Sequence, residues 1–297
     1  MSERGMTRRT AAGAATQLGT SVSVNLGSAL AGLVIPVVGA FVVVAVRQLV
    51  MAAVVLPIYR PKRARPTLRR LWPALALGVA MALMNLTFYE AVHLLGLGIA
   101  ATIEFLGPLA VALFASRRLL DVVCALVAAA GVFTLTGFDG SMNPWGVLLA
   151  LTAAGAWAAY ILLTRRVATR LPGLEGLTVA TIVSLAILLP FAVLTFDVRL
   201  IDWRVLAILV GVGLLSSAIP YSLDTFVLRR ITPRLYAIVT ASGPVVAALF
   251  GWLILSEHLT LIEVIAIAVV CVAAATAVAT QRDQPTTPLE TLAESTP

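Results

Sequence analysis

Long apolar runs separated by short polar connections fill most of this chain. Each run is close to the ~20 residues that a helix needs to cross a bilayer. The pattern therefore predicts ten membrane-spanning helices, at residues 11–34, 38–58, 71–93, 97–115, 119–137, 144–164, 174–196, 204–227, 234–255 and 260–280. The predicted fold class is an all-α polytopic membrane protein, in which short connections make neighbouring helices pack antiparallel.

The fourth and ninth predicted helices share an interruption. The fourth contains Gly107-Pro108 and the ninth contains Gly243-Pro244, and in each the same Ala-Leu-Phe tripeptide follows four residues after the proline. Proline has no backbone N–H, so it cannot continue the hydrogen-bond ladder of a helix. We expect these four residues to be bending points, or hinges, that leave backbone carbonyls exposed.

The spacing of these two motifs, close to half the chain, predicts a duplication. The repeats cover residues 11–137 and 144–280, with five helices each. Because five is an odd number, the second repeat must enter the membrane upside down. Inverted repeats are typical of secondary transporters, which bind substrate near the midplane between the repeats. Residues 1–10 and the Thr-, Pro- and Glu-rich residues 281–297 flank the repeats, and the latter are expected to be disordered.

Glu104 is the deepest acid of the first repeat. It lies four residues before Pro108, so a carboxylate and a carbonyl without its helical partner share one level of a membrane helix. A charged side chain at a helix centre costs about 2.5–3.5 kcal/mol on insertion scales, and such groups face protein or water. We expect Glu104 to carry a proton or to bind an ammonium group; the alternative is a structural carboxyl bonded to a neighbouring helix.

The first predicted helix carries a polar stripe. Gln17, Ser21, Asn25 and Ser28 recur at intervals of four, four and three, which places them on one face of a helix. Small polar residues also join helices by hydrogen bonds in many bundles. We favour a face that lines a cavity, because the stripe runs along nearly the whole span.

Two further charged residues are embedded in predicted spans. Arg47 in the second helix suits a carboxylate, either that of a substrate or that of a protein acid such as Glu104, and the internal ion pair is favoured. Asp224 in the eighth helix is nearer the cytoplasmic end. It has a role in gating or coupling, or else it is a snorkelling acid that pairs with a loop.

Composition and charge narrow the class of protein. Hydrophobic residues make up 60% of the chain and charged residues 12%, with a mean hydropathy of +1.01, which excludes an ordinary soluble domain. Nearly all of the 21 Lys and Arg residues fall on the side of the N-terminus, whereas only Arg199 and Arg204 fall in loops on the other side. The bias predicts an inner-membrane protein with both termini cytoplasmic and a retained first helix, not a nucleic-acid-binding protein.

Residue types that support enzymatic chemistry are scarce. Cys124 and Cys271 fall inside apolar runs and are expected to pack, not to form a disulfide or a metal site. With two histidines, both near the outer surface, a membrane-embedded enzyme is disfavoured, and we expect neither a metal nor a cofactor. A scaffold or sensor without transport activity would not need an acid and a polar stripe that converge inward.

Several motifs resemble a known family. The two Gly-Pro helices and the stretch 255–260 resemble the EamA-type drug/metabolite transporters. This chain has Ser256 at a position where that family usually has glycine. The segments 104–113, 116–118 and 220–224 are similar to the threonine/homoserine exporter branch. This resemblance implies export of small amino acids driven by the proton gradient, and a turn or capping role for Glu257.

These observations together predict a transporter that works by alternating access. Its central cavity should be lined by the first, third, fourth, sixth, eighth and ninth helices. The predicted substrate and proton site comprises Glu104, Arg47, Asp224, Gln17, Ser21, Asn25, Tyr221 and Thr240. The expected partners are a small-molecule substrate and membrane lipid. Another metabolite, a drug or a lipid as substrate, and uptake instead of export, stay alternatives at this point, and the oligomeric state is open.

Overall fold

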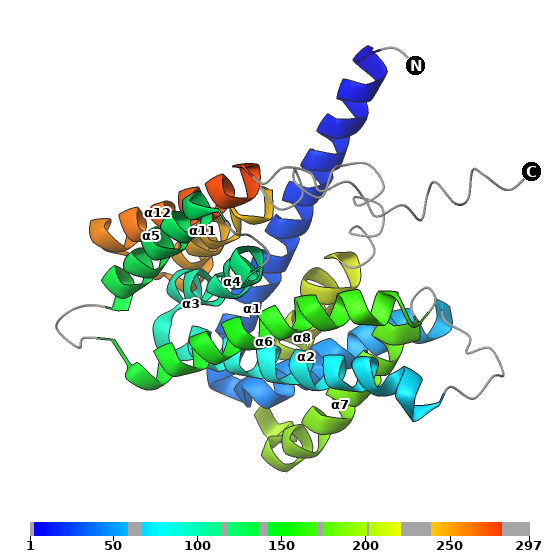
Figure 1. Cartoon of the computed structure of the whole chain (residues 1–297). Coiled ribbons are helices and arrows are strands. Elements are labelled where there is room, and N and C mark those ends of the chain that lie inside the picture. The colour runs from blue at the N-terminus through cyan, green and yellow to red at the C-terminus, as the bar shows by residue number, and fades with distance from the viewer. Residues whose placement is uncertain are drawn as a thin grey trace, which may run out of the picture.

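The computed structural model describes residues 3–58, 67–114, 118–136, 142–171, 175–200, 202–220 and 239–280. Within these ranges the chain is helical apart from short turns, and no strand is present (Figure 1). Five of the described helices are long and apolar enough to cross a membrane, and further apolar helices are shorter. The prediction of an all-α polytopic membrane protein is therefore confirmed, whereas ten spans in two inverted repeats remain a prediction.

The helices follow the predicted apolar runs closely. The helix α1 (Glu3–Ile58) covers the first two runs and is divided at Gly39, whose φ of 80° and ψ of 156° favour glycine. The other helices are α2 (Leu68–Leu95), α3 (Leu97–Glu104), α4 (Leu106–Phe114), α5 (Leu119–Thr136), α6 (Pro144–Ala168), α7 (Glu175–Thr195), the 3₁₀ turn η1 (Val198–Leu200), α8 (Trp203–Gly213), the π-helical turn η2 (Leu214–Ala218), α11 (Gly243–Leu255) and α12 (Leu261–Thr280).

Helices from the two predicted repeats share one core. The helix α2 packs on α6 and α7, α5 packs on α12, and α1 contacts α7, α8, η2 and α11 (Figure 1). The largest buried cluster accordingly joins Tyr89 and Ile103 to Ala153, Leu209 and Ala247. On the outside, large apolar side chains are exposed on several helices, as a lipid-facing surface requires.

Both Gly-Pro motifs coincide with an interruption in a helix. In the first motif, α3 ends at Glu104, and Phe105 separates it from α4. The helix is interrupted there because Pro108 offers no N–H to the carbonyl of residue 104. In the second motif, residues 241–242 form a turn immediately before α11. The two glycines differ in their surroundings. A Cβ on Gly107 would overlap the carbonyl oxygen of Ala154 on α6, whereas a Cβ on Gly243 would meet nothing within 4 Å.

In the described part of the chain, the two interrupted helices pack together through α3 and α11. The helices α3 and α11 run antiparallel in close contact, so that a Cβ on Gly98 would lie 2.9 Å from Cα of Ala248. Beyond Phe105 the chain turns away, and α4 packs on α6 and α5. The break at Phe105 therefore marks the level at which the described parts of these two helices diverge.

Candidate functional site

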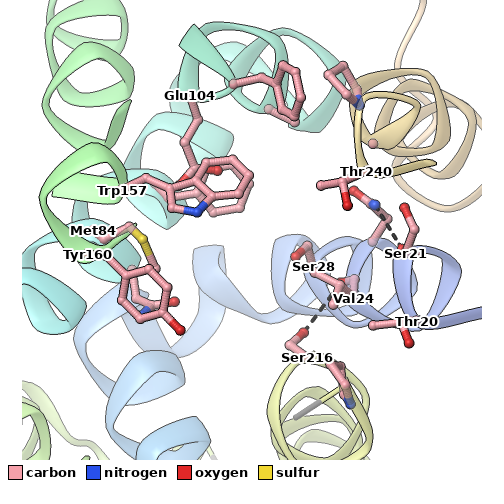
Figure 2. Close-up of a pocket in the computed structure, with 18 of the residues that line it drawn as sticks. Thr20, Ser21, Val24, Ser28, Met84, Glu104, Trp157, Tyr160, Ser216 and Thr240 are labelled. Carbon is pink, nitrogen blue, oxygen red and sulfur yellow. Dashed lines mark hydrogen bonds between the residues drawn. The ribbon is translucent and has the colours of Figure 1, made fainter. Parts of the chain in front are cut away.

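A cavity of about 280 Å³ lies at the level where α3 and α11 diverge. It is lined by Gln17, Thr20, Ser21, Val24, Asn25, Ser28, Arg47, Met84, Asn85, Phe88, Ala101, Glu104, Phe105, Trp157, Tyr160, Ser216, Pro220, Thr240, Gly243 and Pro244. These residues come from all six of the runs that were expected to line a cavity, and Arg47 adds the second run. Figure 2 shows them converging from α1, α3, α6, η2 and the segment that leads into α11.

The polar stripe of α1 lies in the cavity wall. Ser21 and Ser28 face the cavity in Figure 2, and Asn25 donates from Nδ2 to the carbonyl of Ser21 at 2.9 Å. The residue Ser23, beside the stripe, instead donates to the carbonyl of Leu215 at 2.8 Å. The polar residues of α1 therefore do both things that the sequence suggested. The stripe lines the cavity, and Ser23 beside it joins α1 to a neighbouring helix.

Arg47 is held in the wall by neutral groups. Its Nε donates to Oγ of Ser217 at 2.7 Å, and its Nη2 donates to the carbonyl of Ser216 at 2.9 Å. Its Nη1 donates to Oδ1 of Asn85 and, at 3.3 Å, to Oη of Tyr89, whose ring centroid lies 5.8 Å from Cζ. Four of the five N–H groups of the guanidinium are therefore used to fix its position, and none of them meets an acid.

Two local features of the backbone build this cradle. Asn85 and Tyr89 are four residues apart on α2, so their side chains share one face of the helix. Ser216 and Ser217 belong to the π-helical turn η2, where each turn holds an extra residue. Such turns occur frequently at functional sites. None of these four residues was predicted from the sequence to belong to the site. The only local hint was the pair of adjacent serines inside an apolar run.

Glu104 ends α3 with its side chain directed toward the cavity beside Trp157 (Figure 2). Its carboxyl forms no hydrogen bond and no ion pair with any residue that the structure describes. The charge of Arg47 acts on it through space. The ion pair between Arg47 and Glu104 that the sequence favoured is therefore not formed in this structure, because Ser216, Ser217 and their neighbours already hold the guanidinium.

Aromatic residues form an apolar part of the wall near Glu104. The rings of Phe105 and Trp157 meet edge to face with centroids 6.0 Å apart, and Tyr160 follows almost one turn later on α6. Trp157 was expected to pack rather than to meet a ligand. It packs on Phe105 and also borders the cavity.

Of the remaining predicted site residues, some border the cavity and others lie outside the described residues. Gln17 donates from Nε2 to Oγ1 of Thr240 at 3.3 Å, which links α1 to the segment before α11. The other amide atom of Gln17, Oε1, is buried and has no hydrogen-bond partner among the residues that the structure describes. Gly243 and Pro244 border the cavity. The predicted residues Tyr221 and Asp224 lie outside the residues that the structure describes.

The described side chains offer little to a metal ion. No group of three or more His, Cys, Asp or Glu residues gathers anywhere in the described part of the chain. Cys124 and Cys271 are buried as free thiols. Among the described residues, the cavity thus offers one carboxyl, one guanidinium, and hydroxyl, amide and aromatic groups around them.

Comparisons with known proteins agree with this architecture. The chain is 32% identical over 266 residues to threonine/homoserine exporter RhtA of Salmonella typhimurium (strain SL1344), which covers 89% of this chain and 90% of that protein. It is 34% identical over 254 residues to threonine/homoserine exporter RhtA of Escherichia coli (strain K12), covering 84% and 86%. A crystal structure of a 22% identical protein shares the fold with a TM-score of 0.61, over 89% of this chain and 98% of that one.

A family model supports the same assignment. Residues 144–279 match the EamA-like transporter family, and the RhtA exporters extend the similarity over most of the chain. Transporters of this kind move small molecules across a membrane and carry out no chemical conversion. The chain therefore belongs to the EamA-like transporter family of the drug/metabolite transporter superfamily, as an RhtA-like membrane protein.

Proposed function

We propose that this protein exports small amino acids of the threonine or homoserine type. The observation that carries the proposal is the pair of charged groups in one cavity. Glu104 has no hydrogen-bond or ion-pair partner among the described residues, and Arg47 is held by neutral groups. An α-amino acid is a zwitterion, so its ammonium complements Glu104 and its carboxylate complements Arg47. Two opposite charges that are not paired with each other suit such a ligand better than they suit an uncharged one.

The size of the cavity supports a small substrate. Its volume of about 280 Å³ is below the ~300–1,000 Å³ that is usual for sites of drug-sized ligands. The polar stripe of α1 and the hydroxyl of Thr240 supply partners for a substrate hydroxyl. The curated relatives are named as exporters of threonine and homoserine, both of which have a small side chain with a hydroxyl.

The transport cycle that we propose is alternating access between two inverted five-helix repeats. The repeats are residues 11–137 and 144–280, in ten spans of a bacterial inner membrane with both termini in the cytoplasm. The antiparallel contact of α3 with α11 is the arrangement that inversion of the two Gly-Pro helices would give. The breaks at Phe105 and at residues 241–242 border the cavity or adjoin it, so bending there would alter access to the substrate.

Export by this cycle would be driven by protons through Glu104. Its carboxyl can bind either a proton or the substrate ammonium, but not both. A carrier that returns only when Glu104 is protonated therefore exchanges protons for substrate. The membrane lipid around the helices is the remaining partner in this proposal, since large apolar side chains cover the outside.

The proposal is tested by transport in vesicles that contain the purified protein. A panel of labelled amino acids is offered with and without a pH gradient. We expect a gradient to drive accumulation of threonine or homoserine, and not of an amine without a carboxylate. Absence of amino-acid transport, together with transport of an apolar drug or a lipid, would contradict the proposal.

Orientation is tested separately in intact cells. Single cysteines in residues 60–70 and 165–171 should be shielded from impermeant thiol reagents, whereas those at 139–142 and 197–202 should react. Labelling of 60–70 from outside would contradict the inverted repeat.

A further inference from the structure

Glu257 is an acid that the proposed substrate site does not use. It lies in the connection between α11 and α12, outside the apolar spans. Its Oε1 accepts the backbone N–H of Leu97 at 2.6 Å, and its Oε2 accepts that of Gly98 at 3.4 Å. These are the first two N–H groups of α3, which have no partner within their own helix. A side chain from the second repeat therefore caps a helix of the first repeat, 160 residues earlier.

Two glycines make the space for this carboxylate. A Cβ on Gly96 would lie 2.9 Å from Cδ of Glu257, and a Cβ on Gly251 would overlap its Oε2. The backbone aims the side chain into this space. Ser256 adopts a left-handed conformation with φ of 55°, and the N–H of Glu257 then donates to the carbonyl of Gly251 at 3.1 Å. A left-handed turn also suits the glycine that the family resemblance gives as usual at position 256.

The capped end of α3 leads directly to the cavity. Ala101 and Glu104 of α3 line the cavity, while Leu97 and Gly98 lie about one turn beyond Ala101 and touch the second repeat. The close approach of Gly98 to Ala248 belongs to the same contact. Separating α3 from α11 at this end would open a route from the cavity, and it would require the bonds to Glu257 to break.

The electrostatics of Glu257 come from the backbone. Burial raises the pKa of its carboxyl, and the N–H groups of Leu97 and Gly98 lower it in part. The positive end of the α3 dipole also favours the carboxylate. Among the described residues, the titratable side chains near this end of the packed helices are Glu90 and His93 on α2, His258 next to Glu257, and Glu263 on α12, and none of their charges acts on Glu257.

We propose that Glu257 is a positioning residue for transport, which holds α3 of the first repeat against the connection between α11 and α12 and releases it when the cavity opens at that end. This inference rests on the proposed alternating access. It does not depend on which substrate is carried. The two bonds satisfy backbone N–H groups that have no partner within α3, and leaving such groups without a partner is costly. Their loss should therefore shift the balance between closed and open forms by about 10- to 100-fold.

The test measures access to the cavity without any substrate. A single cysteine at Ser28 in the cavity wall is introduced after Cys124 and Cys271 are replaced by alanine. Its rate of reaction with an impermeant thiol reagent is measured in intact cells and in inverted vesicles. A cysteine at the exposed His258 identifies the side on which the connection lies. On that side, Glu257→Ala should raise the rate by about 10- to 100-fold.

Two further variants separate positioning from general stability. Gly251→Ala keeps the acid but fills its space, so it should raise the rate as Glu257→Ala does. Glu263→Ala is the matched control, because Glu263 accepts from Thr260 N and Oγ1 at 2.6 and 2.9 Å and so caps its own helix within one repeat. It should lower thermal stability and leave the rate unchanged.

The outcome that overturns the inference is an unchanged rate in both Glu257→Ala and Gly251→Ala at normal folded yield. An equal rise in Glu263→Ala would overturn it too, because the effect would then follow from lost stability. Failure of amino-acid transport in the wild-type protein, with the labelling pattern intact, would count against the proposed substrate and leave the role of Glu257 standing.

Discussion

Replacing Arg47 by glutamine removes the one cation among the described residues of the cavity wall. If the guanidinium attracts a substrate carboxylate, the loss should cost about 1.5–3 kcal/mol of binding free energy, the usual contribution of a hydrogen bond to a charged group. The Kd for the amino acid should therefore rise about 10- to 150-fold. Because four N–H groups of Arg47 are already used by the protein, most of this attraction is Coulombic, with one N–H left for the ligand.

The Arg47→Gln change also affects folding stability, so the affinities of two ligands must be compared on the same variant. Glutamine leaves Ser217, Asn85 or the carbonyl of Ser216 short of a donor, and each unsatisfied buried group costs about 1–3 kcal/mol. Relief from burying a cation offsets part of that cost. The ratio of affinities for an amino acid and for the matching amino alcohol, which lacks the carboxylate, is independent of the stability change.

The assay is equilibrium binding to the purified protein with both ligands. Wild type should prefer the amino acid, and Arg47→Gln should lose that preference while its affinity for the amino alcohol stays within about threefold. The matched control is Arg204→Gln, since Arg204 is an exposed arginine with its Cζ 5.5 Å from the ring centroid of Trp203, outside the cavity. Equal losses for both ligands in Arg47→Gln would refute the assignment of Arg47 to the substrate carboxylate.

Three further predictions concern the breaks and the cap. Pro108→Ala and Pro244→Ala should each preserve expression and reduce transport, because a restored N–H lets the helix straighten; normal transport in both would refute the hinge assignment. Gly107→Ala should lower stability by about 1–3 kcal/mol, measured by thermal unfolding, since its Cβ overlaps the Ala154 carbonyl. Burial raises the pKa of Glu257 in the closed form, so its contribution to closure is complete below the ordinary carboxyl pKa and is lost as pH rises through the raised one. Spin-label distances across this end should therefore shorten in acid, and the pH dependence should vanish in Glu257→Gln.

The sequence was sufficient wherever the determinant is local. Helix limits follow from apolar run length, and the interruption at Phe105 follows from the missing N–H of Pro108. The three-four spacing of polar residues on α1 was enough to expect a cavity face. Glu104 could be singled out because a carboxyl in an apolar helix needs a reason to be there. Each of these inferences uses residues within a single predicted helix.

Contacts between distant segments were not accessible in the same way. The residues that hold Arg47 lie 38 to 170 positions from it in the chain. Two of them, Ser216 and Ser217, belong to a π-helical turn that the hydrophobic periodicity does not predict. For this reason the favoured ion pair with Glu104 is not formed. The capping role that the resemblance implied for Glu257 is present, but the capped helix is α3 and not its neighbour in sequence. The kind of interaction that Arg47 and Glu257 make could be predicted from the sequence, whereas the groups that they contact could not.

Proton coupling through Glu104 is tested by the proton-driven flux of the Glu104→Gln variant in reconstituted vesicles. Glutamine keeps the size and hydrogen-bonding capacity of the side chain and removes its titration. Accumulation of the amino acid driven by a pH gradient is compared with downhill exchange at equal pH, and thermal stability is recorded on the same preparation. If Glu104 couples protons to export, driven accumulation should be lost while exchange and stability persist. Full proton-driven accumulation in the folded variant would contradict this coupling.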